Sequence, residues 1–357
     1  MSDLQQAIDA ASDGDLITLA PGSEVIGDTL EVTNKRITII GDPSGSELAW
    51  DGPVDGRPMI HLRGCNGGSL FDFTLRGREV GSPRGIVIEQ EHGSPYQSTR
   101  CRLERLYLGL PGDCYQAPVL THGVQIVGPT VNDFHQLSDV TVRGAEVALE
   151  ALSAQSVGLT IERLHGYFCG TVFRLGCPML FLRQSYCHHS PVIFDFPFTA
   201  SRAGAVVDGL HVEYGGCLVQ SDRGWFTVDA RQLSHSVIDG SPLIDISGGY
   251  PQTIRLRDSV LEDGRPSAGH PVMVCALRGI AATKVVNLEL AHVQPSLLAD
   301  LCYDTGSHVD GVSTVETVIS APGIYGRLPI NDRRSLGDVS DCDQLNAWID
   351  SQPWSTQ

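Results

Sequence analysis

Apolar and polar residues alternate in many short stretches of this chain. One set of such stretches lies at 71–75, 105–108, 139–142, 163–166, 184–187, 209–212, 235–238, 258–261 and 287–290. A second set lies between them, at 86–89, 123–126, 148–151, 172–175, 193–196, 218–221, 243–246 and 272–275. Alternation of period two over three to six residues predicts short β-strands that bury one face.

The first set also reveals an internal repeat of drifting length. Its units start at Asp72, Arg105, Asp139, Arg163, Gln184, Gly209, His235, Asp258 and Asn287, and neighbouring starts are separated by 21 (Arg163 to Gln184) to 34 residues (Arg105 to Asp139). No helical pattern separates the strands, which excludes βαβ units. We therefore predict an all-β fold, a right-handed single-stranded parallel β-helix with one coil per repeat. Polar or turn-forming residues at the unit starts indicate a tight bend between two sheets.

The two ends of the chain differ from this rhythm. Ser2 and Gln5 form a capping-box pattern, and the apolar face that follows predicts a short helix over the open end of the coil. We expect a capping helix in 1–15, the β-helix in 16–292, and an irregular C-terminal cap or oligomerisation segment in 293–357. Short helices are expected there at 295–301 and 340–349.

The opening of the chain resembles a known superfamily. The stretch LQQAIDAASDGDLITLAPGSEV, followed by RITIIGD, is similar to the start of pectin-lyase-like β-helix proteins, and the resemblance covers residues 3–292. This superfamily includes pectate lyases, polygalacturonases, alginate epimerases and phage tailspikes, so the resemblance implies the fold and a polysaccharide ligand but no single chemistry. The catalytic signatures of its enzymes find no match here, and no residue role is carried over from them.

Charge and cysteine usage narrow the classes of partner. The 357 residues carry a net charge of −17, which argues against nucleic acid or an anionic membrane as the main partner. No apolar run is long enough to span a bilayer, and Met1 is followed by neither a basic nor an apolar leader. The 10 cysteines form no CxxC motif, and we interpret them as reduced core fillers. We expect a cytoplasmic or virion protein without a cofactor.

A row of polar residues on the second set of strands is the first candidate site. It contains Glu89, Gln125, Glu150, Arg174, Asp195, Gln220, Asp245 and Cys275. We predict Glu150, Arg174 and Asp195 as catalytic residues. The two carboxylates would lie two coils apart, about 9.6 Å at about 4.8 Å per coil, against about 6.5–9.5 Å in inverting glycosidases. Arg174 would neutralise a uronate or act as a base, and Gln125, Gln220 and Asp245 would bind substrate.

The alternative for this row is a solvated, charge-balanced ladder that stabilises the sheet weakly.

Rings on the first set of strands form the second candidate site. Tyr107, Thr141, His165, Tyr186 and His211 occupy equivalent positions, and stacked rings offer a flat platform for sugars. The alternative is that the rings shield their own sheet or face a neighbouring subunit.

Two further segments contain candidate residues. Residues 221–232 are expected to form a polar loop in which Trp225 contacts glycan or is anchored in the core, with Asp222, Arg223 and Asp229 beside it. Cys187, His188 and His189 are not expected to share a metal, because neighbouring residues on a strand point to opposite faces. His235 is interpreted as a turn residue.

Three functional hypotheses follow. The first is a phage tailspike-like or virion-associated homotrimer, assembled with other virion proteins, that binds a host surface polysaccharide and in one version depolymerises it. The second is a free polysaccharide lyase or glycoside hydrolase. The third is a structural β-helix without catalysis that presents its faces for assembly.

Overall fold

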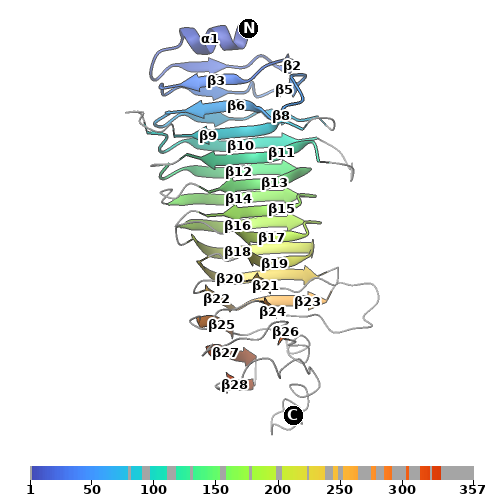
Figure 1. The fold of residues 1–357 in the computed structure, drawn as a ribbon. Helices are drawn as coiled ribbons and strands as arrows, with labels where there is room; N and C mark the ends of the chain where they lie inside the picture. Colours follow the sequence, from blue (N-terminus) through green and yellow to red (C-terminus); the bar gives the residue numbers. More distant parts are fainter. Residues whose placement is uncertain are drawn as a thin grey trace. The chain divides into compact units, whose positions relative to one another are not determined.

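The computed structural model describes residues 2–78, 82–90, 97–110, 118–128, 132–152, 158–176, 179–197, 203–222, 225–237, 244–247 and 252–263, together with strands β24 to β28. The chain divides into two compact units, Met1–Tyr186 and Cys187–Gln357, and each is described by itself. In both, the described residues form stacked β-strands (Figure 1). The predicted all-β parallel β-helix with one short N-terminal helix is confirmed.

Helix α1 (Asp3–Ala10) opens the first unit. The Ser2 hydroxyl accepts the Gln5 backbone N–H at 3.1 Å, as the capping-box pattern predicts. The Gln5 side chain turns toward strand β3, where its Oε1 accepts from the backbone N–H of Glu31 at 2.8 Å. Leu4 and Ile8 are buried, and the Lys35 ammonium donates to the Ile8 carbonyl near the helix end at 3.0 Å.

Two sheets build the first unit. Sheet A contains β1 (Leu16–Thr18), β2 (Gly22–Ile26), β4 (Thr38–Ile40), β5 (Ser46–Trp50), β7 (Ser69–Phe71), β8 (Thr74–Arg76), β10 (Arg102–Gly109), β12 (Gln136–Arg143), β14 (Leu159–Tyr167) and β16 (Leu180–His188), at which the unit ends. Sheet B contains β3 (Leu30–Thr33), β6 (Pro58–Arg63), β9 (Arg84–Glu89), β11 (Leu120–Val127), β13 (Ala145–Ala151) and β15 (Thr171–Leu175). Neighbouring strands of consecutive coils pair in parallel.

Sheet A bends in the middle of each coil, where the sequence repeat has its unit starts. Arg105, Asp139 and Arg163 have left-handed backbones, with φ between 52° and 56°, and strand pairing continues on both sides of each. One left-handed residue thus turns the strand without ending it. This explains why β10, β12 and β14 are longer than the three to six residues expected. The first two coils turn through longer linkers, 19–21 and 41–45.

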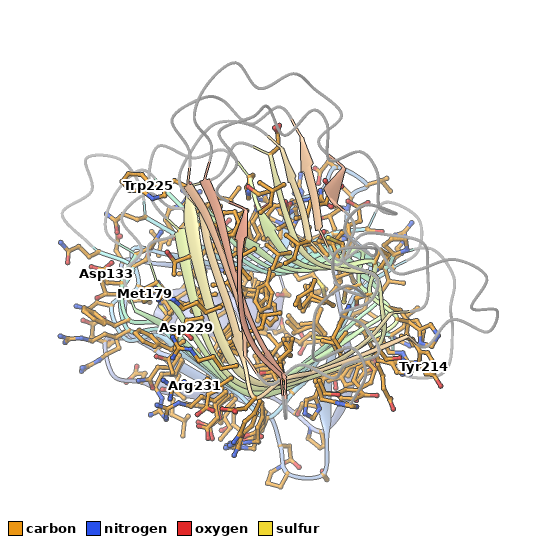
Figure 2. The ribbon with its side chains drawn as sticks, turned by 90° about the horizontal axis from the view of Figure 1, so that it is seen from below. Asp133, Met179, Tyr214, Trp225, Asp229 and Arg231 are labelled. Atoms are coloured by element: carbon orange, nitrogen blue, oxygen red, sulfur yellow. The ribbon has the colours of Figure 1, made fainter. Side chains whose placement is uncertain are left out.

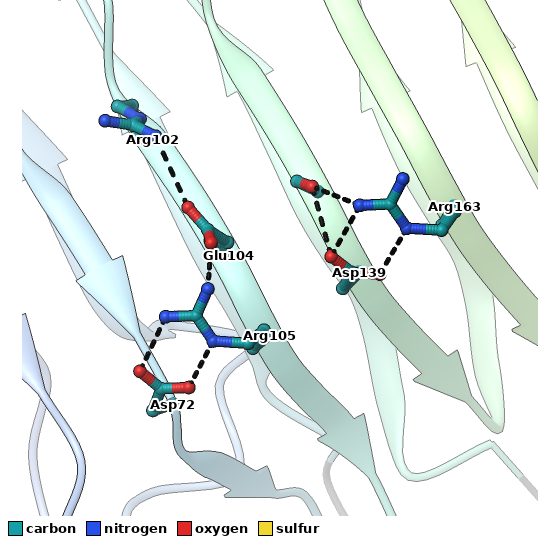
Figure 3. Close-up of polar contacts among 7 residues, drawn as sticks. Asp72, Arg102, Glu104, Arg105, Asp139 and Arg163 are labelled. Atoms are coloured by element: carbon teal, nitrogen blue, oxygen red, sulfur yellow. Dashed lines mark hydrogen bonds and ion pairs between the residues drawn. The ribbon is translucent and has the colours of Figure 1, made fainter.

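The bend residues also pair across coils (Figure 3). Arg105 donates to both carboxylate oxygens of Asp72, at 2.5 and 2.8 Å, and Arg163 holds Asp139 at the same two distances. In each case the guanidinium hydrogen bonds hold the pKa of the carboxyl below its usual range. The tight bend, which was expected between two sheets, thus lies within sheet A and carries a ladder of paired charges.

Inward-facing residues form the core of the first unit. Leu103, Val124, Leu149, Ile161 and Phe173 are fully buried, and each such side chain contributes about 1.5–3 kcal/mol relative to exposure. Buried cysteines fill further positions: among the described residues, Cys65, Cys101 and Cys169 of this unit are free thiols, as expected, and so are Cys187 and Cys217 of the second unit. Burial raises the pKa of Cys169 to about 11, so this thiol stays protonated.

The second unit repeats the two-sheet arrangement. Its sheet A contains β18 (Ala203–Gly215), β20 (Phe226–Val237), β22 (Gln252–Arg257), β23 (Val260–Asp263), β25 (Val285–Ala291), β27 (Thr314–Ala321) and β28 (Ile324–Ile330). Its sheet B contains β17 (Val192–Phe196), β19 (Cys217–Asp222), β21 (Ile244–Ser247), β24 (Cys275–Arg278) and β26 (Tyr303–Asp304). The ring of Phe196 stacks on that of Phe226 in its core, with centroids 4.4 Å apart.

Parallel pairing continues past residue 292, because β27 pairs with β25, whereas β28 pairs with β27 in the antiparallel direction. Whether 293–357 caps the coil or mediates assembly stays a prediction, and both helices expected there lie outside the described residues. In the described part of the chain, no helix has the length and hydropathy needed to cross a membrane.

Candidate functional site

The polar row on sheet B of the first unit is a connected network. Gln125, Glu150 and Arg174 occupy the same register position on β11, β13 and β15, as predicted. The Gln125 amide donates to Glu150 Oε1 at 2.6 Å, and Arg174 Nη1 lies 3.6 Å from Glu150 Oε2. Although these residues face outward, the Glu150 side chain is only 7% exposed.

Glu150 is held as a carboxylate. Burial alone would raise its pKa, but hydrogen bonds from His122 and Gln125 and the charge of Arg174 outweigh burial and lower the pKa below its usual value. A glycosidase acid must instead be protonated near neutral pH, which requires a raised pKa. A lowered pKa therefore suits Glu150 for a structural or a base role better than for that of an acid.

The predicted row missed two members of this network. Arg84 Nη1 donates to Gln125 Oε1 at 2.8 Å, and His122 Nε2 lies 3.4 Å from Glu150 Oε2. Strict alternation places His122 on the same side as Val124, in the core. The alternation fails at Gly123, where a Cβ would lie 2.6 Å from the carbonyl oxygen of Ala148. No sequence signal other than that glycine marks the change of face.

The predicted register is wrong at both ends of the row, at Glu89 and at Cys275. Glu89 pairs with Val127, and Val87 stands opposite Gln125. Glu89 instead accepts from His61 Nε2 at 2.7 Å. Glu89 therefore lies two positions further along its strand than the residue that stands opposite Gln125.

In the second unit, Asp195, Gln220 and Asp245 share one register position, as predicted, but Ala276 and not Cys275 follows them. Gln220 is exposed, whereas Asp195 is buried. Glu150 and Asp195 belong to different units, so the separation proposed for them stays a prediction.

The ring platform on sheet A of the first unit lies beyond the bend. Tyr107, Thr141 and His165 stand at one register position on β10, β12 and β14. The ring of Tyr186 on β16 meets His165 edge-on, with centroids 6.3 Å apart. All four side chains are partly exposed, so the structure brings the first four predicted members of this row together on one outer face. The rings of His165 and Tyr186 meet at 81°, so they do not form the flat, stacked platform that was expected.

Three residues that were not part of the predicted row extend this surface. The ring of Tyr167 lies 5.6 Å from that of Tyr186, centroid to centroid. The guanidinium carbon of Arg143 lies 5.9 Å from the Tyr167 ring centre and 5.2 Å from that of Phe168. Tyr167 faces outward because it follows His165 by two positions on a strand, so alternation alone could have found it. We call Tyr107, Arg143, His165, Tyr167 and Tyr186 the aromatic row.

The bend of sheet A carries a hollow of about 850 Å³ in the first coils. Its lining includes Thr18, Ile40, Asp72, Thr74, Arg105 and Tyr107. The hollow therefore ends at the first ring of the aromatic row. Tyr107 is fixed there because its hydroxyl donates to the Leu110 carbonyl at 2.9 Å.

The remaining predicted ligands lie in the second unit. The His211 side chain is half exposed, with Nε2 3.9 Å from Glu213 Oε1. Trp225 is 42% exposed at the start of β20 and lies on the same side as Asp229 and Arg231, with Tyr214 at another corner (Figure 2).

The polar loop expected at 221–232 is wrong, because Phe226–Val237 form strand β20. Phe226, and not Trp225, is the buried anchor. The alternating side chains of Phe226, Val228 and Ala230 point into the core. The polar residues between them made this strand resemble a polar loop in the sequence.

Two histidine interpretations also change. His235 is fully buried in β20, with Nε2 2.9 Å from the Gly216 carbonyl, while the bend is made by Gln232 (φ 52°). His188 and His189 do not point to opposite faces: His189 is left-handed (φ 50°), and the two Nδ1 atoms lie 2.9 Å apart. Among the described residues, no three His, Cys, Asp or Glu side chains converge on a possible metal position.

Comparisons with known proteins add a structural likeness. No protein-family model matches the sequence, and no curated protein matches it. Among solved structures, the chain is similar to an endo-xylogalacturonan hydrolase from Aspergillus tubingensis, with a TM-score of 0.42 and 9% identity over 90% of this chain and 93% of the other. The parallel β-solenoid agrees with the fold implied by the resemblance to pectin-lyase-like proteins, and function has to be argued from the sites themselves.

Proposed function

We propose that this chain binds a polysaccharide, and that the aromatic row is the surface that contacts the sugars. The observation that carries the proposal is the contact of His165, Tyr167 and Tyr186 on neighbouring strands, with ring centroids 5.6–6.3 Å apart and every ring partly exposed. Rings of this kind offer apolar faces to the C–H side of a sugar and polar tips to its hydroxyls.

The row is built to keep its shape before any ligand binds. Its members are placed by parallel strand pairing, and Arg143 lies against Tyr167 and Phe168. Little side-chain freedom then remains to be lost on binding, which favours affinity. Strands about 4.8 Å apart also present their rings at a repeat comparable with the length of one sugar residue.

A panel of immobilised polysaccharides tests the proposal. The panel contains neutral glucans, xylans, mannans and galactans, together with polygalacturonate. We expect the wild-type chain to bind at least one member and Tyr186→Ala to lose that binding, because a central ring is removed. The matched control is Tyr214→Ala, which removes a 44% exposed tyrosine ring outside the row. Failure of the wild type to bind any member, or equal binding by Tyr186→Ala, would overturn the proposal.

Cleavage is a separate proposal that uses Glu150, Arg174 and Asp195. In its favour, Glu150 and Arg174 form a charged network on the outer face of sheet B, and Glu150 is held ionised. The test is product release from the bound polysaccharide by Glu150→Gln and Asp195→Asn. Release that survives both changes would contradict this assignment, whereas binding by the aromatic row would be unaffected.

The biological setting that we propose is a virion-associated homotrimer acting on a host surface polysaccharide. The resemblance to a superfamily that includes tailspikes supports this setting. Light scattering of the native chain, repeated after mild SDS treatment, tests it: a detergent-resistant trimer is expected, and a monomer would contradict it.

A further inference from the structure

We infer that the hollow at the bend of sheet A is the end of the same glycan site, so that one neutral oligosaccharide chain runs across consecutive strands from the hollow onto the aromatic row. This inference rests on the proposed polysaccharide binding and deepens it. It assigns the direction of the bound chain, its approximate length and its charge class.

The hollow exists because the first coils turn differently from the later ones. Between β4 and β5 the bend takes the five residues 41–45, whereas in β10 it takes the single residue Arg105. Gly41, Asp42, Pro43 and Gly45 of this longer linker line the hollow. Four residues of this five-residue linker thus supply part of the lining, whereas the single-residue bend of β10 supplies Arg105.

The hollow and the aromatic row share a residue and a direction. Tyr107 lines the hollow and is also the first ring of the row, in register with Thr141 and His165. Thr74, another lining residue, pairs directly with Tyr107. A ligand that leaves the hollow at Tyr107 and follows the row therefore crosses the strands at right angles, one strand at each step.

The length of the site follows from the strand spacing. The hollow begins at Leu16 and Thr18 on β1, and the row ends at Tyr186 on β16. The strands between them, β4, β7 with β8, β10, β12 and β14, make six steps, or roughly 29 Å at about 4.8 Å per step. With one sugar residue per step, the site accommodates roughly six residues.

The charges in the hollow favour a neutral ligand. Asp72 and Arg105 in its lining bind each other through two hydrogen bonds, and they offer acceptors and donors to hydroxyls while their charges cancel. Asp42, also in the lining, accepts hydrogen bonds from the hydroxyl and the backbone N–H of Ser44, which lower its pKa and keep it negative. A uronate would meet this second carboxylate and a chain of net charge −17. Hydroxyl-rich neutral sugars avoid both.

The test uses oligosaccharides of two to eight residues from the panel member that binds best, with affinities measured by titration calorimetry. For the wild-type chain we expect affinity to rise with length and to level off near six residues. Thr74→Trp places a large side chain in the lining of the hollow, and we expect it to weaken binding of the hexamer about tenfold while leaving the trimer unchanged. Thr18→Trp, at an exposed lining position, repeats the test without disturbing the sheet. Thr33→Trp, at an exposed position on sheet B, is the matched control.

Each outcome decides one claim. If both hollow variants bind hexamer and trimer as the wild type does, or if polygalacturonate is the preferred polymer, this inference is wrong while the aromatic row stands. If no panel member binds the wild-type chain, the proposed function fails and the inference fails with it. Loss of trimer binding in the hollow variants, with melting temperatures unchanged, would also contradict the inference, because short chains would then sit in the hollow and not on the row.

Discussion

The rings of Tyr167 and Tyr186 lie 5.6 Å apart, centroid to centroid, although they come from successive coils. Such a contact contributes about 0.5–1.5 kcal/mol beyond area burial. We predict that a double-mutant cycle of Tyr167→Ala and Tyr186→Ala, measured by urea unfolding, gives a coupling energy in the lower half of this range, because both rings are partly exposed. Additive effects would show that the rings do not form one surface.

The bend residues allow a test that separates charge from backbone conformation. Asp139→Asn removes the paired charge but keeps a residue that tolerates a left-handed backbone, so we expect a loss of at most about 1 kcal/mol, as for exposed ion pairs. Asp139→Ala removes both and should cost about 1–2 kcal/mol more, since alanine adopts this conformation poorly. Equal unfolding free energies for the two variants would contradict the conformational part of the argument.

Burial lowers the pKa of His135 to about 4, and its Nδ1 accepts the Cys101 backbone N–H at 3.2 Å. The folded chain thus keeps His135 neutral, whereas the unfolded chain protonates it near pH 6.5. Stability from this group is fully present above pH 6.5 and is lost as the pH falls toward 4, by up to roughly 3 kcal/mol.

We expect His135→Asn to flatten the stability profile between pH 6.5 and 4 in urea titrations. The matched control is His211→Asn, the same substitution at a half-exposed histidine. A wild-type profile that is already flat in this range would contradict the buried, neutral assignment.

Glu150 gives a second pH dependence at lower pH. Because its folded-state pKa is lowered, its contribution is present above the unfolded-state value near 4.3 and is lost as the pH falls through the folded-state value. We predict that Glu150→Gln loses less stability than the wild type between pH 4.5 and 3 in thermal melts. An acid limb as steep as that of the wild type would mean that Glu150 is not held ionised by His122 and Arg174.

Much of the fold was predictable because each strand shows a local alternation of apolar and polar residues. The predicted repeat starts from Asp72 to Gly209 all have left-handed backbones and form the bends. They could be found because the apolar and polar alternation is interrupted at each bend. The prediction of a turn at His235 is wrong, because the same alternation also fits a histidine that is buried in a strand and hydrogen-bonded to a carbonyl.

The site was predictable only where alternation stays regular. Tyr107, His165 and Tyr186 follow strict period-two positions, and the structure brings them together on one face. His122 escaped notice because the backbone departs from alternation at Gly123. The hollow depends on how the 41–45 linker folds against the strands around it, and that is a tertiary property that spacing along the chain does not encode.

The most direct test of the central claim is a crystal structure of the chain with the best-binding oligosaccharide from the panel. We predict density for sugar rings across β10, β12, β14 and β16, packed on His165 and Tyr186. Sugar density over Gln125 and Glu150 on sheet B, with the aromatic row empty, would contradict the account.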